Sequence, residues 1–153
     1  GILSMLNKEV TIACEPGRFI VGNSGQFLTK VLYEKRNDKK RFVVVDGAMN
    51  DLLRPSLYNA FHNVKVFKEG ESSLCDVVGP ICESGDFLAK NINLPELEHG
   101  DLLVIESAGA YGMSMSSNYN SRCRAAEVAI EEGEDRLIRK RESYDDLVAQ
   151  ERL

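Results

Sequence analysis

A short stretch from residue 79 to residue 86 places a thiol, a hydroxyl and two carboxylates close together. It reads Gly-Pro-Ile-Cys-Glu-Ser-Gly-Asp, with Cys82 and Glu83 at its centre. Gly79-Pro80 interrupts regular structure and Gly85 permits a sharp turn, so the intervening side chains should project from the end of a strand. A thiol and a carboxylate in such a loop can donate and accept protons. The same residues also suit an ordinary turn with a small buried cysteine and a solvated acidic rim.

A second motif, Glu15-Pro16-Gly17-Arg18, has the residues of an anion-binding turn. Gly17 permits close approach of a backbone, and a helix over residues 18–24 would aim its first N–H groups at a phosphate. Arg18 can add a two-pronged contact to the same anion. Taken alone, the tetrapeptide is equally typical of a β-turn with a surface ion pair.

The third motif is Arg54-Pro55-Ser56-Leu57-Tyr58, and the fourth is Gly109-Ala110-Tyr111-Gly112. A residue before proline is biased toward an extended backbone, so we expect Arg54 to be extended, with Tyr58 four residues further on. Both side chains can then point at one anion, because a guanidinium fork matches a carboxylate. Tyr58 also suits the role of a half-buried core aromatic.

In this order, the four motifs resemble the C-terminal part of the diaminopimelate decarboxylases. These are fold-type III pyridoxal-phosphate enzymes, grouped with the ornithine and arginine decarboxylases and more distantly with alanine racemase. The resemblance covers essentially the whole chain, and Glu83 rather than aspartate after Cys82 points to the diaminopimelate branch. It implies a carbon–carbon lyase that uses pyridoxal 5'-phosphate to decarboxylate meso-2,6-diaminopimelate to L-lysine and CO2, the last step of lysine biosynthesis.

The resemblance also implies a role for each site residue. Cys82 would be the catalytic proton donor. The cofactor would be bound by Glu15, Gly17, Arg18 and Tyr111, and the substrate by Arg18, Arg54, Tyr58, Glu83 and Tyr111. Glu83 would accept the distal ammonium group, and the two arginines with Tyr58 would bind the distal carboxylate. Similar enzymes place the Cys-Glu-Ser loop in the partner subunit's site, which implies a two-fold homodimer.

The lysine that holds the cofactor in similar enzymes has no counterpart in this sequence. Lys30, Lys65 and Lys90 all lie outside the aromatic-Ala-x-Lys-Ala-Asn setting, and the glycine-rich phosphate loop is also missing. We therefore expect a C-terminal portion that is inactive alone and works with an N-terminal barrel domain. Two alternatives stay open: a related decarboxylase of the ornithine, arginine or carboxynorspermidine type, and a non-catalytic dimerisation module. Glu83 and the two arginines favour a substrate with a distal carboxylate.

Composition limits the partners and the compartment. The 153 residues, 43% hydrophobic and 28% charged, suffice for a packed soluble domain, and a net charge of −5 argues against nucleic-acid binding. Four cysteines without a Cys-x-x-Cys pair or a nearby histidine argue against a metal site. No signal peptide or long apolar run is present, so we expect a cytoplasmic protein with free thiols and no membrane contact. The basic stretch at 35–41 should be a solvated hairpin connection, and His62 and His99 should be packing or surface residues.

The elements expected to position these motifs are mainly strands. Residues 1–25 read as the trailing end of a β/α barrel, with a helix at 2–7, a buried strand at 10–14 and a helix at 18–24. Residues 26–153 read as a mainly antiparallel β-barrel or sandwich with some helix, the C-terminal domain that an alanine-racemase-like enzyme would have. The predicted strands are 27–34, 41–46, 64–68, 75–78 and 101–106, followed by a hairpin of 126–130 with 136–140 and a helix capped by Ser143.

Overall fold

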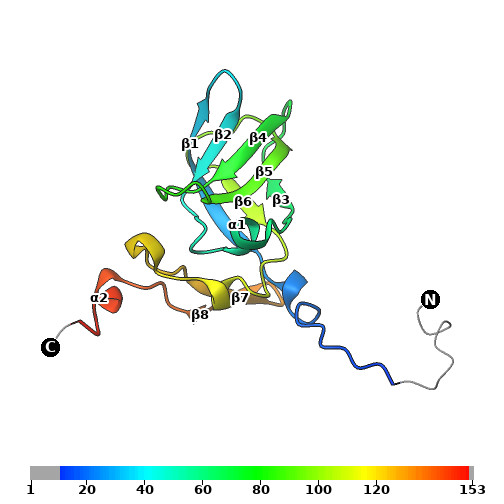
Figure 1. Ribbon diagram of the computed structural model, residues 1–153, viewed down its shortest axis with the longest axis vertical. Helices are drawn as coiled ribbons and strands as arrows, with labels where there is room; N and C mark the ends of the chain where they lie inside the picture. Colours follow the sequence, from blue (N-terminus) through cyan, green and yellow to red (C-terminus); the bar gives the residue numbers. More distant parts are fainter. Residues whose placement is uncertain (1–10, 152–153) are drawn as a thin grey trace.

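The computed structural model describes residues 11–151, and its main body is a curled six-stranded sheet (Figure 1). The strands are β1 (Phe27–Arg36), β2 (Arg41–Val45), β3 (Val64–Val66), β4 (Ser73–Val78), β5 (Phe87–Leu94) and β6 (Leu102–Ile105). They lie in the order β3-β6-β1-β2-β4-β5, and every neighbouring pair is antiparallel except β2 and β4. The body is therefore a nearly closed, mainly antiparallel barrel, which confirms the predicted fold class.

The remaining elements are short and lie outside this sheet. They are the helices α1 (Arg54–Tyr58) and α2 (Tyr144–Leu147), the 3-10 turns η2 (Gly22–Ser24), η3 (Met113–Met115) and η4 (Tyr119–Ser121), and the hairpin of β7 (Glu127–Glu131) and β8 (Glu134–Arg139). Figure 1 shows the hairpin beneath the barrel. Ser143 caps α2 by accepting the Asp146 N–H, while the Asp146 carboxylate accepts the Ser143 N–H. The hairpin and the capped helix are both confirmed.

Strand β5 is the sheet strand absent from the sequence prediction. Its polar and apolar residues do not alternate, because the pairing with β4 shifts register between Cys75 and Val77 and again between Val77 and Val78. Asn91 adopts a left-handed backbone (φ 54°), and its N–H donates to the Asp76 carboxylate over 2.8 Å. An irregularity of this kind bends a strand and hides the period of two on which strand prediction depends.

The predicted β/α unit at the start of the chain does not form in the described residues. The helix at 2–7 and residue 10 of the predicted strand lie outside them. Residues 11–14 are exposed and unpaired, and the helix predicted at 18–24 is instead a turn followed by η2. A strand needs a neighbouring strand for its backbone hydrogen bonds, and the six strands of the barrel pair only with one another.

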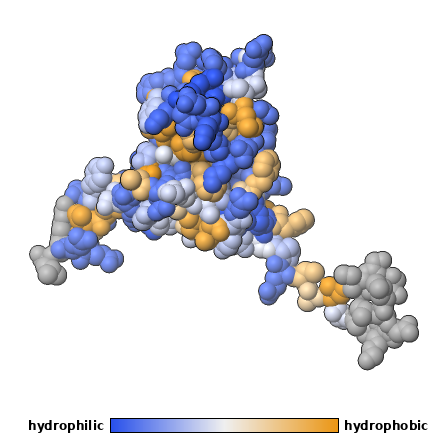
Figure 2. Space-filling model, turned by 45° about the horizontal axis from the view of Figure 1, so that its top comes forward, coloured by the Kyte–Doolittle hydropathy of each residue, from blue (hydrophilic) through white to orange (hydrophobic). Residues whose placement is uncertain are grey.

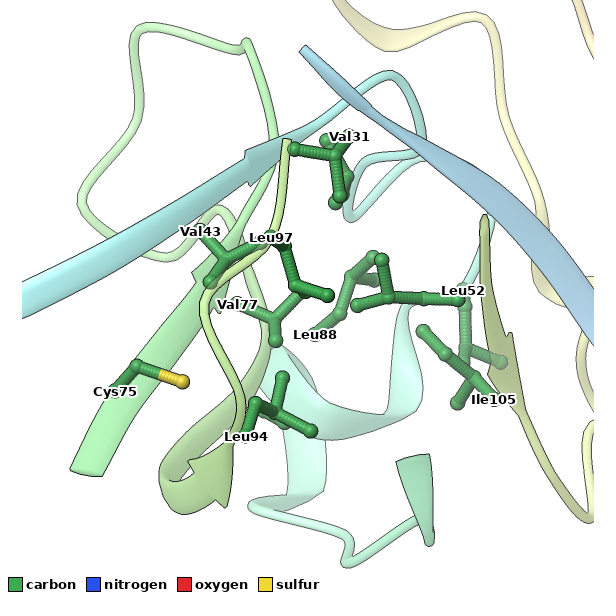
Figure 3. Close-up of a cluster of buried hydrophobic side chains, with 12 residues drawn as sticks. Val31, Val43, Leu52, Cys75, Val77, Leu88, Leu94, Leu97 and Ile105 are labelled. Atoms are coloured by element: carbon green, nitrogen blue, oxygen red, sulfur yellow. The ribbon is translucent and has the colours of Figure 1, made fainter. Parts of the chain in front are cut away.

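The barrel encloses one apolar cluster, drawn in Figure 3. Its members come from β1, β2, β4, β5 and β6 and from the connections that carry Leu52 and Leu97. Most are branched aliphatic side chains with almost no exposed surface. Replacing one of the buried leucines by alanine would therefore lower the free energy of unfolding by about 2–5 kcal/mol. Cys75 belongs to this cluster, and burial raises the pKa of its thiol. This thiol is therefore a packing group, unlike the exposed thiol of Cys82.

The basic stretch at 35–41 is only partly solvated, because Arg41 is 4% exposed. Its guanidinium pairs with the Glu34 carboxylate and donates to the Leu94 carbonyl (2.7 Å) and the Pro95 carbonyl. Glu34 also accepts the Leu97 N–H over 2.8 Å. The prediction of a wholly solvated hairpin connection is therefore wrong at Arg41, which joins the β1–β2 hairpin to the end of β5.

Apolar patches interrupt the hydrophilic surface (Figure 2). Among residues 11–151, the large apolar side chains that are at least 78% exposed are Phe19, Ile20, Phe61, Phe67 and Ile130. Every residue of β8 is exposed, although a two-stranded sheet is rarely stable without packing against another element. Within residues 11–151, no helix is long and apolar enough to cross a bilayer.

Candidate active site

The connection between the parallel strands β2 and β4 carries the first group of site residues. It includes α1, a five-residue helix with Pro55 in its first turn, where a missing N–H costs no helical hydrogen bond. Asn59 ends the helix in a left-handed conformation (φ 51°) and donates its N–H to the Arg54 carbonyl. The prediction of an extended Arg54 is therefore wrong, because the helix offsets the weak bias that Pro55 exerts on its predecessor.

Arg54 lies between two tyrosine rings. Its guanidinium carbon is 5.4 Å from the centre of the Tyr58 ring and 5.5 Å from that of Tyr111, within the range of cation–π attraction. Tyr58 is 60% exposed, so it is not a core aromatic. Tyr111 has a left-handed backbone (φ 61°), a conformation that costs energy for a bulky residue and that clusters at functional sites.

Gly17 meets the hydroxyl of Tyr111. A Cβ atom at position 17 would lie 2.2 Å from the Tyr111 hydroxyl oxygen, so only glycine allows this approach. The predicted helical seat for a phosphate is absent, because the residues after Gly17 form turns and the Gly17 N–H donates to the Glu15 carbonyl over 2.8 Å. The turn at Gly17 and the Tyr111 hydroxyl therefore meet where the sequence predicted a row of helical N–H groups. Glu15, at the start of this motif, is exposed.

Arg18 and His62 bind successive carbonyls of the segment that leaves β6. Arg18 Nη2 donates to the Ser107 carbonyl (3.0 Å), and His62 Nδ1 lies 2.9 Å from the Glu106 carbonyl oxygen. Three buried nitrogens in this region have no hydrogen-bond partner among the described residues: Arg18 Nη1, Arg54 Nε and His62 Nε2. A buried unpartnered donor is costly, so guanidinium groups left in this state are suited to receiving an anion.

The loop of residues 79–86 closes around the carboxylate of Asp86, which is 5% exposed. One carboxylate oxygen accepts the Met49 N–H over 2.8 Å and the other accepts the Ile81 N–H over 2.6 Å. Gly79 leaves room for this arrangement, because an added Cβ would lie 2.4 Å from the carboxylate. Burial raises the pKa of Asp86, and the two N–H donors partly oppose that shift. The hydrogen bonds of the Asp86 carboxylate thus hold the loop in this conformation.

Cys82 and Glu83 lie at the exposed tip of this loop. The Tyr119 hydroxyl donates to the Glu83 carboxylate over 3.3 Å, and the Ser56 hydroxyl of α1 donates to the Gly85 carbonyl over 2.6 Å. The loop is therefore attached to the helix that carries the arginine and tyrosine of the first group. Among the described residues, no hydrogen bond or ion pair joins the tip to either arginine. The predicted site residues thus form two groups. One is a cationic cluster of Arg18 and Arg54 with Tyr58 and Tyr111. The other is the 79–86 loop, which has an accessible thiol and carboxylate.

Four further residues lie in this candidate site. The sequence predicts no role for Ser56, Asp86 and Tyr119, and it predicts only a packing or surface position for His62, which is buried. Asp86 and Ser56 lie inside the sequence motifs, and their polar side chains were the signal that could have indicated a place in the site. No local signal marks His62 or Tyr119, because their hydrogen-bond partners lie 44 and 36 residues away in the sequence.

The family model, the related sequences and the solved structures that match this chain all indicate the same protein family. Residues 18–109 match the model of the pyridoxal-dependent decarboxylase C-terminal sheet domain. A diaminopimelate decarboxylase of Campylobacter jejuni is 58% identical over 99% of this chain, which spans 38% of that relative's length. The crystal structure of diaminopimelate decarboxylase from Helicobacter pylori complexed with L-lysine is 54% identical, covers 98% of this chain with 37% of its own, and has a TM-score of 0.85.

A more distant structure shows how far the likeness extends. The lysine/ornithine decarboxylase of Vibrio vulnificus complexed with cadaverine is 28% identical over 72% of this chain and 31% of its own, with a TM-score of 0.66. The domain match covers more than half of the chain and includes Arg18, Arg54, Cys82 and Glu83. On this evidence, the chain belongs to the pyridoxal-dependent decarboxylases, whose C-terminal sheet domain it carries.

Proposed function

We propose that the chain is the C-terminal portion of a diaminopimelate decarboxylase, which converts meso-2,6-diaminopimelate into L-lysine and CO2. The observation that carries this proposal is the cationic cluster. Within residues 11–151, Arg18 and Arg54 keep buried donors without a hydrogen-bond partner, and Arg54 lies beside Tyr58 and Tyr111. Two guanidinium groups suit a substrate that carries a carboxylate at its non-reacting end. The high identity to named diaminopimelate decarboxylases supports the same substrate.

We propose pyridoxal 5'-phosphate as the cofactor, in line with the family. The residues present fit part of such a site, because the Gly17 backbone and the Tyr111 hydroxyl converge and Arg18 keeps a free donor. Glu15 adjoins this turn and is exposed. The chemistry that pyridoxal phosphate supplies when bound is an electron sink for the electron pair released by loss of a carboxylate.

In this proposal the residues of the chain bind and orient the substrate and protonate its reacting carbon. Arg18, Arg54 and Tyr58 bind the distal carboxylate, and the Glu83 carboxylate accepts the distal ammonium group. When the bond between the reacting α-carbon and its carboxylate breaks, CO2 leaves and the electron pair stays with the carbon. The Cys82 thiol then donates its proton to that carbon, and the thiolate regains a proton from water.

Other parts of the enzyme complete this site. We propose that residues 1–25 continue an N-terminal barrel domain that supplies the cofactor lysine, and that residues 26–153 form the sheet domain. We also propose a homodimer in which Cys82 and Glu83 serve the neighbouring subunit. The exposed apolar side chains and the fully exposed β8 support contacts of this kind. The cytoplasm is the proposed compartment, since Cys14, Cys75, Cys82 and Cys123 are all free.

Cys82→Ala in the full-length enzyme tests the proposed reaction. We expect kcat for meso-diaminopimelate to fall by about 10²–10⁴-fold with KM changed little, because the thiol acts on the reacting carbon and not on substrate binding. Cys123→Ala is the matched control, a half-buried cysteine outside the loop, and should leave both constants unchanged. An unaltered kcat in Cys82→Ala would remove this thiol from the mechanism.

Substrate choice separates the alternatives. The parent enzyme should turn over meso-diaminopimelate and reject L-ornithine, L-arginine and carboxynorspermidine, because only the first offers a carboxylate next to an ammonium at its far end. Preference for one of the others would establish a related decarboxylase. Binding of the cofactor without turnover of any of the four would establish a non-catalytic module.

A further inference from the structure

His62 is a buried histidine beside the two arginines of the cationic cluster. It is 3% exposed, and its Nδ1 lies 2.9 Å from the Glu106 carbonyl oxygen. A carbonyl oxygen can only accept a hydrogen bond, so Nδ1 must carry the proton. In the uncharged ring the other nitrogen, Nε2, then presents a lone pair and acts as an acceptor.

Donors lie near this acceptor, because the charges of both Arg18 and Arg54 act on His62. Among residues 11–151, Nε2 has no hydrogen-bond partner, and neither do Arg18 Nη1 and Arg54 Nε. Arg18 and His62 are attached to the successive carbonyls of Ser107 and Glu106, which keeps the two side chains close. Ser107 has a left-handed backbone (φ 58°), which interrupts the alternation that sends successive carbonyls of a strand to opposite sides.

The charges around His62 favour its uncharged form. Burial lowers the pKa of His62, the bond to the Glu106 carbonyl opposes that shift, and the positive charges of Arg18 and Arg54 lower the pKa further. The carboxylate of Glu106, whose carbonyl His62 contacts, is already occupied by Lys65 (2.5 Å) and by the Asn63 amide (2.7 Å). A protonated ring would therefore add a third cation without a counterion.

We propose that His62 is a positioning residue for the distal-carboxylate site: its uncharged ring accepts a guanidinium N–H of Arg18 when the arginines close on a carboxylate. This inference rests on the proposed function for its ligand. A planar guanidinium holds a carboxylate with two parallel bonds only in one orientation, and an acceptor on a third N–H fixes that orientation. The carbonyl of Ser107 already fixes one nitrogen of Arg18, and His62 supplies the second fixed point.

Ligand binding to the pyridoxal-phosphate-loaded, full-length protein tests this inference without turnover. L-lysine, the proposed product, keeps the distal carboxylate, whereas 1,5-diaminopentane is the same molecule without it. Isothermal titration calorimetry would compare the parent with His62→Asn and His62→Gln. The asparagine amide can replace Nδ1–H at the Glu106 carbonyl but has no group at the Nε2 position, whereas the glutamine amide reaches that position and supplies an acceptor oxygen.

The two variants separate a positioning role from a structural one. We expect His62→Asn to weaken L-lysine binding by about tenfold or more, the loss typical of one hydrogen bond to a charged group, and to leave 1,5-diaminopentane unaffected. His62→Gln should bind L-lysine more tightly than His62→Asn. If His62 only anchors the Glu106 carbonyl, the ranking reverses, and that result would overturn the inference.

A matched control and the parent protein complete the test. His99 makes the same bond, from Nδ1 to the Leu32 carbonyl over 2.9 Å, but it is exposed. His99→Asn should therefore leave L-lysine affinity unchanged. If the parent fails to prefer L-lysine over 1,5-diaminopentane, the proposed carboxylate site is wrong and this inference falls with it. If the parent shows the preference and His62→Asn retains it, only the role of His62 is wrong.

Discussion

The contact between Gly17 and Tyr111 is a steric constraint that a double-mutant cycle can measure. Gly17→Ala would place a methyl group 2.2 Å from the Tyr111 hydroxyl oxygen but 3.4 Å from the ring carbon that bears it. We expect Gly17→Ala to weaken pyridoxal-phosphate binding to the full-length enzyme by more than tenfold, because Tyr111 must move. Tyr111→Phe removes the colliding oxygen, so Gly17→Ala should cost little in that background. Titration of the cofactor by absorbance measures all four proteins.

Gly22→Ala is the control for this cycle. A Cβ at position 22 would meet its neighbours at 3.6 Å or more, which is ordinary contact, so cofactor affinity should stay within a few-fold of the parent. Equal losses from Gly17→Ala in the two backgrounds would show that the steric contact with the hydroxyl is not the cause.

At the scale of single residues, the sequence proposes candidate side chains for the site but not all of their partners. Cys82 and Arg54 stand out as candidates because turn-forming residues surround them. Arg18 is a candidate too, yet its hydrogen bond reaches the Ser107 carbonyl across 89 residues. His62 depends in the same way on a distant carbonyl and on two arginines from separate segments. Local patterns predict which groups can react, whereas the folded chain decides which groups meet.

The ion pair of the buried Arg41 and the largely buried Glu34 joins elements that are distant in the chain. Burial raises the pKa of Glu34, but the hydrogen bonds from Arg41 and the Leu97 N–H and the nearby positive charges outweigh burial, so the pKa is lowered overall. A carboxylate with a lowered pKa stabilises the fold above its unfolded pKa, and that contribution is lost as the pH falls through the folded value. The window for Glu34 therefore begins near pH 4.5 and extends downward.

We predict that Glu34→Gln in the full-length protein increases local opening of β1, β2 and the 94–97 segment at pH 7. Loss of a charge-assisted hydrogen bond to a buried arginine costs about 1.5–3 kcal/mol, which corresponds to faster amide exchange by about tenfold or more. Hydrogen exchange with mass spectrometry would report it. The difference from the parent should begin to shrink below pH 4.5, where Glu34 becomes protonated in the open state, and should disappear only below the lowered pKa of the folded state.

The exposed pair of Arg36 and Glu96 supplies the matched control. Its carboxylate is 78% exposed and only 2.6 Å from the guanidinium, so the pair is well formed but solvated. Glu96→Gln should change exchange hardly at all. Similar exchange in Glu34→Gln and Glu96→Gln would mean that the buried pair does not hold these elements together.

At the scale of elements, regular patterns were predictable and irregular ones were not. The apolar runs gave five of the barrel strands, and Glu132-Gly133 lies in the tight turn of the β7–β8 hairpin, where both residues have left-handed backbones. Strand β5 escaped because its register shifts against β4. Helix α1 escaped because a five-residue helix has too few turns to show a period, and a proline near its start suggests extended backbone instead.

At the scale of the whole molecule, the proposed dimer predicts complementation between two inactive variants. One full-length variant would lack the cofactor lysine of the barrel, and the other would be Cys82→Ala. If the loop serves the neighbouring subunit, a mixed dimer contains one site with both defects and one with neither. We expect activity to return toward about half that of the parent for each mixed dimer, provided that the two sites act independently. Steady-state decarboxylation after subunit exchange measures it.

Subunit exchange must be demonstrated in the same samples, for example by native mass spectrometry of differently tagged chains. Mixing Cys82→Ala with itself should restore nothing. If exchange is complete and activity stays absent, the loop acts within its own subunit and the shared-site proposal is wrong.

The parallel pairing of β2 with β4 has a consequence for the order of folding. The chain must complete the connection that carries Arg54, Tyr58 and His62 before β4 can reach β2, whereas β1 and β2 pair across a short hairpin. Closing a long connection costs entropy before the strand contacts compensate for it, so the proposed carboxylate site would gain its geometry late. A ligand that bridges Arg18 and Arg54 binds only the finished arrangement, and by mass action it stabilises the paired strands as well. In a newly made chain, bound substrate would then stabilise the folded arrangement of these strands as well as react.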